Sequence, residues 1–502
     1  MKKWISPFVF FITLFSLIFA LFPKNLPAQT NFGVNWHIPE DTREARKQLR
    51  AFHSWGFEYL SVDTKMDPQL LDMADSLGFC INVRIPNYFT TAYDLRTEGE
   101  EIVQNAVNFV EYYQRYPNIC GIGLFHLAAD YHPTFRRLSG PLVQKFNEIS
   151  EWPVYLTFYL PKHQEVDELP VVEGIMYRAS EMATVDITAD DRLQGILLKP
   201  EIERYNLRGL QQMIHSEPFA EGIPLYIDSK WLLYQVNHHP ELANFIREFA
   251  NDSEALFSTP NPKVTRDTAN WIVLLLVLLW GSFAFHYGIV PLYRKSFSRY
   301  FVTHHFFVND VMERRIRTIS TGVIILIQQA LLGGTFFYLL SAGLLSQTGL
   351  EALHHHYPLL GIMGNNRFIF FLGGVLFMLL TQVIYLLWLY LLHADVNYFN
   401  QVVLLYAWPQ QLQFFIITIM ATLFLAGSTG FLFKLMMILI IFIWLASFYI
   451  AAADLTKMLR DRKVRYLIYT AGLHTILLTL LLVYIFSWSS LPNVLSLAMH
   501  LS

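Results

Sequence analysis

Short apolar runs between residues 30 and 265 end in polar or aromatic side chains that could bind or transform a substrate. The carboxylates of Asp130, Glu201 and Asp228 could supply acid, base or nucleophile, and the imidazole of His126 could act as a general acid. Aromatic rings can cover the apolar face of a pyranose while polar groups bond its hydroxyls. This mixture favours a sugar site. The candidate sugar-binding residues are Asn35, Trp36, His37, Asp63, Arg84, Asn87, His126 and Trp231. Strand-end residues also cap strands and pair with one another, so each candidate has a structural alternative.

The apolar runs alternate with amphipathic segments, such as residues 42–56, 67–78 and 100–117. Near-continuous apolar strands separated by helices are typical of a parallel sheet that is buried on both faces. Eight such runs predict a (β/α)8 barrel, in which polar residues at the strand ends share one face. The alternative is an open Rossmann-like sheet. It is disfavoured because no glycine-rich G-x-G-x-x-G turn follows the first run, which also argues against a bound dinucleotide.

The second half of the chain has the composition of a membrane domain. Six apolar segments, each long enough to cross about 30 Å of hydrocarbon as a helix, lie near residues 271–291, 319–345, 368–392, 401–427, 430–452 and 466–488. We therefore expect an all-α domain of six transmembrane helices at residues 266–502, after a barrel at residues 30–265. Glutamines at membrane depth either join helices by hydrogen bonds or line a substrate path.

Charges predict how the chain is oriented in a bilayer. In residues 1–29 two lysines precede an apolar run, which is followed by a proline and a small residue, the pattern of a signal peptide or an uncleaved anchor. Connectors rich in arginine and lysine, at residues 294–317 and 457–465, should be cytoplasmic. Residues 30–265 and the C-terminus then face the periplasmic or extracytoplasmic side of the inner (cytoplasmic) membrane.

Composition bounds the remaining partners. The formal net charge of −3 offers no basic field for nucleic acid. Cys80 and Cys120 are the only cysteines and lie in apolar runs, so we expect small core residues there and no disulfide framework. No cofactor or metal is indicated. The expected partners are a carbohydrate and the lipid bilayer, and the oligomeric state stays open.

Three stretches resemble glycoside hydrolase family 2, the β-galactosidase and β-glucuronidase type. They are "FGVNWH", "LLDMADSLGFCINVRIPNY" and "FVEYYQRYPNICGIGLFHL", in the order found in that family's barrel, and they span roughly residues 32–130. The resemblance implies a (β/α)8 barrel that cleaves O-glycosyl bonds. The stretch "YFNQVVLLYAWPQQLQFF" in the other half is similar to Yip-type and uncharacterised bacterial multi-helix membrane domains.

The departures from the family pattern concern catalysis. The position of the family's acid/base glutamate is Leu127, the residue before it is His126, and Arg84 stands where the family has an acidic residue. Retaining glycosidases need two carboxyl groups about 5–5.5 Å apart, and leucine can supply neither function. The leading hypothesis is a carbohydrate-binding pseudo-enzyme linked to envelope or polysaccharide handling.

Two alternatives stay open. One is an active glycosidase that pairs Asp130 with Glu201 or Asp228. The other is a membrane-assembly or transport protein whose exported domain docks a protein. No catalytic residue is assigned on the sequence alone.

Overall fold

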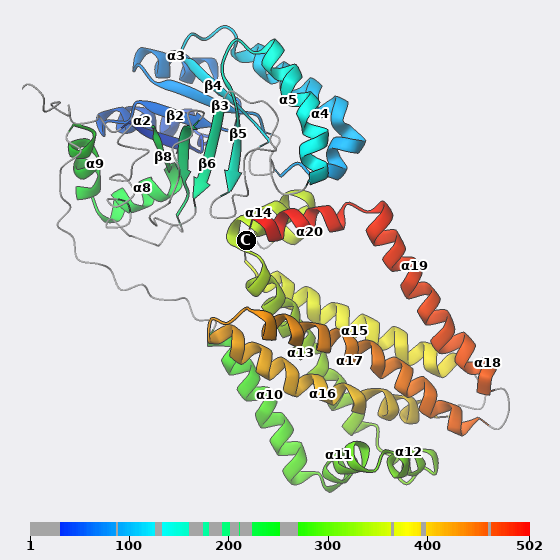
Figure 1. Ribbon diagram of the computed structural model, residues 1–502. Coiled ribbons are helices and arrows are strands. Elements are labelled where there is room, and N and C mark those ends of the chain that lie inside the picture. The colour runs from blue at the N-terminus through cyan, green and yellow to red at the C-terminus, as the bar shows by residue number, and fades with distance from the viewer. Residues whose placement is uncertain are drawn as a thin grey trace, which may run out of the picture. The chain divides into compact units, whose positions relative to one another are not determined.

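The chain divides into two compact units, Met1–Val264 and Thr265–Ser502 (Figure 1). The computed structural model describes residues 31–86, 89–125, 133–159, 174–179, 193–200, 210, 223–251, 270–362, 366–392, 398–459 and 463–501. The expected signal or anchor segment at residues 1–29 lies outside the described residues.

The first unit alternates strands and helices. Its strands are β1 (Phe32–Trp36), β2 (Tyr59–Val62), β3 (Cys80–Arg84), β4 (Ile119–Leu124), β5 (Val154–Tyr159), β6 (Gly174–Ala179), β7 (Leu193–Leu198) and β8 (Leu225–Asp228). Its described helices are α2 (Thr42–Ser54), α3 (Pro68–Ser76), α4 (Ala92–Tyr113), α5 (Pro133–Ile149), α8 (Ser229–His238) and α9 (Glu241–Asn251).

The eight strands form a closed barrel in sequence order. All neighbouring strands are parallel, and β1 closes the ring because it pairs with both β2 and β8. The predicted (β/α)8 barrel is therefore confirmed, and the open-sheet alternative is wrong. Since every strand runs in the same direction, the carboxyl ends of all eight meet at one rim.

Local sequence signals explain where the helices begin and which face they bury. Asp41 caps α2 by accepting a hydrogen bond from the Arg43 backbone N–H at 2.9 Å, and α2 then buries Leu49 and Phe52. Thr91 and Asp94 form a reciprocal capping box at the start of α4. These caps pair backbone N–H groups that a helix start leaves without an internal partner.

Two tyrosine rings fill much of the barrel interior. Tyr155 on β5 and Tyr226 on β8 are completely buried and pack with Met176 and Leu197. Neighbouring strands carry glycine where these rings approach, and a Cβ on Gly123 would lie 2.7 Å from the Tyr155 ring. The Tyr226 hydroxyl accepts a hydrogen bond from the side-chain amide of Asn82 on β3.

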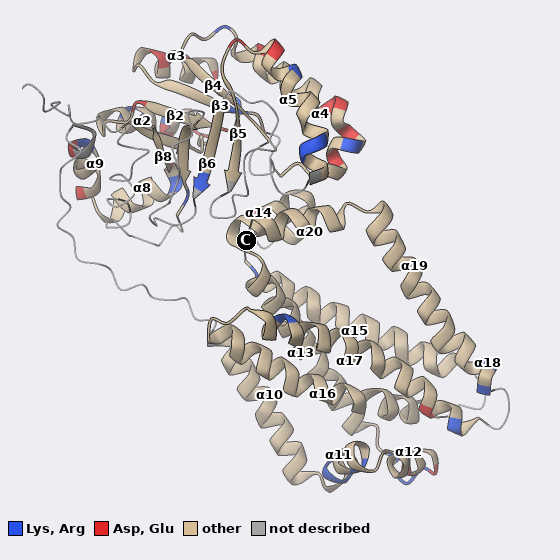
Figure 2. Cartoon of the chain, viewed as in Figure 1, with Lys and Arg blue, Asp and Glu red and all other residues tan. Residues whose placement is uncertain are grey.

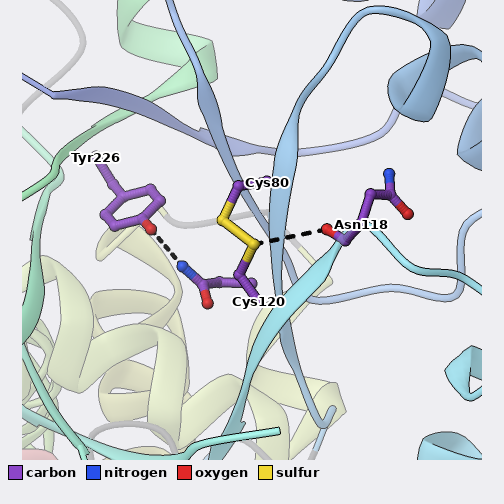
Figure 3. The surroundings of a disulfide bond; sticks show 5 residues. Cys80, Asn118, Cys120 and Tyr226 are labelled. Atoms are coloured by element: carbon purple, nitrogen blue, oxygen red, sulfur yellow. Dashed lines mark hydrogen bonds between the residues drawn. A yellow bond between two sulfur atoms is a disulfide. The ribbon is translucent and has the colours of Figure 1, made fainter.

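The two cysteines form a disulfide, contrary to the expectation from the sequence (Figure 3). Cys80 on β3 and Cys120 on β4 are 40 residues apart in sequence, but adjacent strands bring their Cα atoms to 5.7 Å. That spacing is typical of a disulfide. The expectation of two independent core residues is wrong, because strand neighbours cannot be identified from two isolated cysteines.

The second unit is helical. Its α-helices are α10 (Asn270–Ile289), α11 (Pro291–Val302), α12 (His304–Met312), α13 (Ser320–Leu344), α14 (Gln347–His356), α15 (Phe368–Leu391), α16 (Phe399–Leu425), α17 (Phe431–Leu455), α18 (Lys463–Leu467), α19 (Leu473–Trp488) and α20 (Leu491–His500). Among the described residues, six helices are long and apolar enough to cross a membrane. They lie within Trp271–Ile289, Ser320–Leu344, Phe368–Leu391, Phe399–Leu425, Phe431–Met458 and Lys463–Trp488.

Charge is concentrated at one end of this helical unit (Figure 2). The lysines and arginines of α11, of α18 and of the segment that follows α12 lie there, while the long helices are almost free of charge. Two buried carboxylates are neutralised at this end. Asp310 pairs with Arg299 and with Arg315, and Asp454 lies 3.0 Å from the Lys457 ammonium. His304 Nε2 lies 2.9 Å from the other carboxylate oxygen of Asp454, and this contact links α12 to α17.

We predict that replacing Gly123 by alanine destabilises the barrel by about 1–3 kcal/mol, because the added methyl overlaps the fixed Tyr155 ring. The control is Gly99→Ala in α4, where a Cβ meets no other atom within 4 Å. That change should stabilise the helix by about 0.5–1 kcal/mol. Urea unfolding of a purified segment 30–265 measures both. Equal effects of the two substitutions would contradict the packing argument.

Candidate functional site

Five polar side chains from four strand ends form a closed ring of contacts at the rim of the barrel. This rim cluster comprises Asn35, His37, Asp63, Arg84 and Asp228. Arg84 donates a hydrogen bond to the Asn35 side-chain oxygen, and Asn35 in turn donates to Asp228 Oδ2 at 3.4 Å. His37 Nε2 lies 2.9 Å from the same Oδ2. Asp63 completes the ring, with Oδ2 3.6 Å from Arg84 Nη2 and 3.8 Å from His37 Nδ1.

The strand geometry explains why these residues meet. Asn35 is the penultimate residue of β1 and faces the barrel interior. It pairs in register with Asp228 of β8. Arg84 ends β3, while His37 and Asp63 directly follow β1 and β2. Since neighbouring parallel strands end at the same rim, residues almost 200 positions apart in sequence come into hydrogen-bond contact.

Asp228 has both carboxylate oxygens engaged. Oδ1 accepts hydrogen bonds from the backbone N–H groups of Lys230 at 3.0 Å and Trp231 at 3.2 Å, and so caps α8. Oδ2 faces Asn35 and His37. One buried residue therefore ends β8, starts α8 and holds the rim cluster together.

Electrostatics keeps Asp228 ionised. Burial by itself would raise the pKa of this carboxyl. The hydrogen bond and charge of His37 outweigh burial, with help from the Lys199 charge and the Trp231 N–H, and the pKa lies below its ordinary value. A carboxylate only accepts hydrogen bonds, so His37 Nε2 carries the proton that it donates to Asp228.

His37 and Asp63 are the members of the rim cluster that solvent can reach. The side chain of His37 is 25% exposed and that of Asp63 is 14% exposed, whereas Arg84 and Asp228 are at 2% and 3%. The His37 backbone N–H also donates to the Ser229 hydroxyl at 3.0 Å. A ligand at the rim would meet His37 and Asp63 first, and the buried members would act by fixing those two side chains.

The two candidate tryptophans lie apart from the exposed part of the rim. Trp36 is completely buried between β1 and α2, where its indole N–H donates to the Gln48 side-chain oxygen at 2.9 Å. The Trp231 side chain on α8 is also completely buried. A ring that stacks on a sugar must expose a face, so neither tryptophan belongs to the site that we propose below. Asn87, His126, Leu127, Asp130 and Glu201 lie outside the described residues.

Reasoning from the sequence missed Ser229 as a positioning residue. The sequence signal that could have identified Ser229 is its position directly after Asp228, at the boundary between β8 and α8. It also missed two aromatic residues with left-handed backbones, Phe89 with φ 55° and Phe125 with φ 46°. They follow β3 and β4 on the same rim. Strained bulky residues of this kind are concentrated near binding and catalytic sites.

The comparisons with known proteins are distant. No protein-family model matches the chain, and no curated protein does. Similar solved structures include a GH2 β-galacturonidase from Eisenbergiella tayi, with 14% identity over 40% of this chain and 34% of that chain and a TM-score of 0.27. The β-glucuronidase of Ruminococcus gnavus has 10% identity over 40% of this chain and 43% of that chain, with a TM-score of 0.31. The β-D-glucuronidase of Dictyoglomus thermophilum has 11% identity over 39% of this chain and 43% of that chain, with a TM-score of 0.28. The chain spans less than half the length of these enzymes. At this level of similarity, the site must be interpreted from its own geometry.

We predict that Asp228→Asn lowers the free energy of unfolding at pH 7 by about 1–3 kcal/mol, since a buried charged acceptor is lost. The folded pKa of Asp228 is lowered, so its contribution is complete above the ordinary aspartate pKa of about 4. The contribution disappears as pH falls through the lower folded value. The difference between wild type and variant should therefore shrink in acid.

Urea unfolding at pH 7 and pH 3 measures this difference. Asp41→Asn is the control, because Asp41 also caps a helix but is exposed. We expect its effect at pH 7 to be the smaller of the two. A loss for Asp228→Asn that is the same at both pH values would contradict the assignment.

Proposed function

We propose that the barrel binds carbohydrate at the rim cluster and does not hydrolyse it by the retaining double displacement. The chain would be a multi-pass protein of the inner membrane, with the barrel on the periplasmic or extracytoplasmic side, and would serve envelope or polysaccharide handling. The observation that carries the proposal is the placement of His37, partly exposed and held between Asp63 and Asp228.

The chemistry of the rim cluster suits hydroxyl groups. A sugar hydroxyl both donates and accepts, so it can bond to the two exposed members of the cluster, the Asp63 carboxylate and the His37 imidazole. The buried ring of contacts holds these groups in place before a ligand arrives. Prior ordering of this kind reduces the entropy lost on binding.

The described part of the site does not suit glycosidic cleavage. A retaining mechanism needs a carboxylic acid that protonates the leaving oxygen and a carboxylate that attacks the anomeric carbon, and the sugar lies between these two groups. Asp228 has a lowered pKa and is an ionised acceptor with both oxygens engaged. The His37 ring stands between Asp228 and Asp63, where the sugar would have to lie.

Three observations support the proposed orientation. The Cys80–Cys120 disulfide suits an oxidising compartment outside the cytoplasm. Most cations of the second unit lie at the end formed by α11, α12 and α18, the expected cytoplasmic end. The N-terminal pattern of a signal or anchor would export the segment that follows it.

We predict that alkaline phosphatase fused after Ser502 is active and that the same enzyme fused after Arg299 is inactive. Alkaline phosphatase folds only outside the cytoplasm, because it needs its own disulfides. Colony colour and enzyme assays with matched expression levels measure the outcome. Activity after Arg299 combined with inactivity after Ser502 would invert the topology.

We predict that the purified protein binds a glycan on an array and that His37→Ala weakens this binding about 10- to 100-fold. This factor corresponds to the loss of one hydrogen bond that involves a charged group. His53→Ala is the matched control, because His53 is an exposed histidine on the outer helix α2. That variant should bind like the wild type.

The same preparation should not hydrolyse aryl β-galactosides, β-glucuronides, β-mannosides or β-glucosides. Turnover that disappears in Glu201→Gln or Asp228→Asn would establish the glycosidase alternative in place of a pseudo-enzyme. If neither binding nor turnover is found for any glycan, the protein-docking alternative becomes the leading one.

A further inference from the structure

Five buried glutamines lie on two neighbouring helices of the second unit, which we call the membrane unit because it holds the six helices that are long and apolar enough to cross a membrane. Gln328 and Gln329 belong to α13, and Gln410, Gln411 and Gln413 belong to α16. The exposed fraction of each is 3% or less. We call these five residues the glutamine layer.

Packing places the two groups of glutamines at the same depth. Near the start of both helices, a Cβ on Gly322 of α13 would touch Val403 of α16. Farther along, Phe336 of α13 and Met420 of α16 share one hydrophobic cluster, so the two helices run in the same direction. Gln328 lies six residues after Gly322 in α13, and Gln410 lies seven residues after Val403 in α16. At about 1.5 Å per residue, both glutamines lie about 10 Å along the helix axis from the contact between Gly322 and Val403.

Many polar atoms of this layer have no protein partner. The unpartnered acceptors are the Oε1 atoms of Gln328, Gln329, Gln410 and Gln411. The unpartnered donors are the Nε2 atoms of Gln329, Gln411 and Gln413 and the indole Nε1 of Trp408 on α16. The partners that do exist are few. Gln328 donates to the Ser282 hydroxyl of α10 at 2.9 Å, and Gln410 donates to the Tyr406 carbonyl at 3.3 Å.

Donors and acceptors without partners are destabilising in an apolar interior, and so many in one layer require a group that satisfies them. That group must be neutral, because α10, α13, α15 and α16 contain no Asp, Glu, Lys or Arg that would balance a charge. In α17, which packs against α16, the charged residues Lys434 and Asp454 lie near the two ends of the helix. It must also donate and accept in equal measure, because the unpartnered atoms do both. Hydroxyl groups have both properties.

We propose that the glutamine layer binds neutral hydroxyl groups inside the membrane unit, supplied either by water or by a small sugar or polyol. This site is independent of the rim cluster of the barrel. It goes beyond joining helices, because in Gln329 and Gln411 both the side-chain oxygen and the side-chain nitrogen remain without a protein partner.

Radiolytic labelling of the full-length protein in lipid nanodiscs tests the proposal. An X-ray pulse generates hydroxyl radicals from bulk and bound water, and mass spectrometry locates the oxidised side chains. Trp408 is completely buried, yet it should be labelled several-fold more than Trp36. Trp36 is the control because it is equally buried and its indole N–H has a protein partner. Labelling of Trp408 no higher than that of Trp36 would overturn the proposal.

Variants identify what holds the hydroxyl groups. In the double variant Gln329→Leu with Gln411→Leu, labelling of Trp408 should fall to the level of Trp36. The matched control is Gln382→Leu, because Gln382 is a buried glutamine of α15 whose amide already donates to the Leu326 carbonyl at 3.2 Å. It should leave the labelling of Trp408 unchanged. If the double variant does not insert, Gln411→Leu alone gives the same comparison. Labelling that persists in the leucine variants would overturn the role of the glutamines.

Added solutes separate the two sources of hydroxyl groups. Glycerol, D-glucose and D-galactose are each titrated during labelling of the wild-type protein. A saturable decrease in labelling at Trp408, with Trp36 unchanged, assigns the site to a sugar or polyol. Labelling that no solute reduces assigns it to bound water. Both results support the hydroxyl site, and neither depends on ligand binding by the barrel.

Discussion

The barrel depends on how two tyrosine rings are accommodated inside it. Tyr155 and Tyr226 are completely buried and occupy the space between opposite strands, and the strands next to them carry glycine at the points of closest approach. Side chains in a barrel interior must fill it without overlap, because protein interiors are close-packed. Large residues on two strands therefore require small residues on their neighbours. This constraint decides which residue types the neighbouring strands can carry, and it lets the backbone ladder close into a ring without overlap of side chains.

The rim cluster is a consequence of that closure. Once β8 lies beside β1, Asp228 and Asn35 are in register, and His37 comes within hydrogen-bond distance of the Asp228 carboxylate. The carboxylate also caps α8, so a change there affects stability and site geometry together. Because both oxygens of Asp228 are engaged, its side chain is held in one position. Its lowered pKa leaves the carboxylate poorly suited to donate a proton, which is consistent with a binding role.

The membrane unit obeys a different constraint. Its long helices expose apolar side chains outward and bury their polar ones, since a bilayer offers no water to unpaired groups. Buried carboxylates occur at the cationic end, where arginine, lysine and histidine neutralise Asp310 and Asp454. At greater depth the polar side chains are neutral. The glutamine layer thus follows the rule against charge in hydrocarbon while keeping a capacity for hydrogen bonds that the protein itself does not use.

The sequence by itself determined the element types and their order. Eight apolar runs with amphipathic segments between several of them were enough for the barrel, and six long apolar segments were enough for the membrane helices, because both patterns are local in the chain. It also placed His37, Asp63, Arg84 and Asp228 at strand ends. Only the tertiary structure decided which strand ends are neighbours, and so which side chains share a hydrogen bond.

The same distinction explains the errors. The Cys80–Cys120 disulfide joins strands whose adjacency follows from barrel order, not from any local pattern around either cysteine. Trp36 was a candidate for stacking on sugar because it ends a strand, but side chains alternate between the two faces of a strand. Asn35 therefore points into the barrel, while Trp36 points outward to α2. Contacts between distant segments depend on how the whole chain closes, and no short stretch of sequence contains that information.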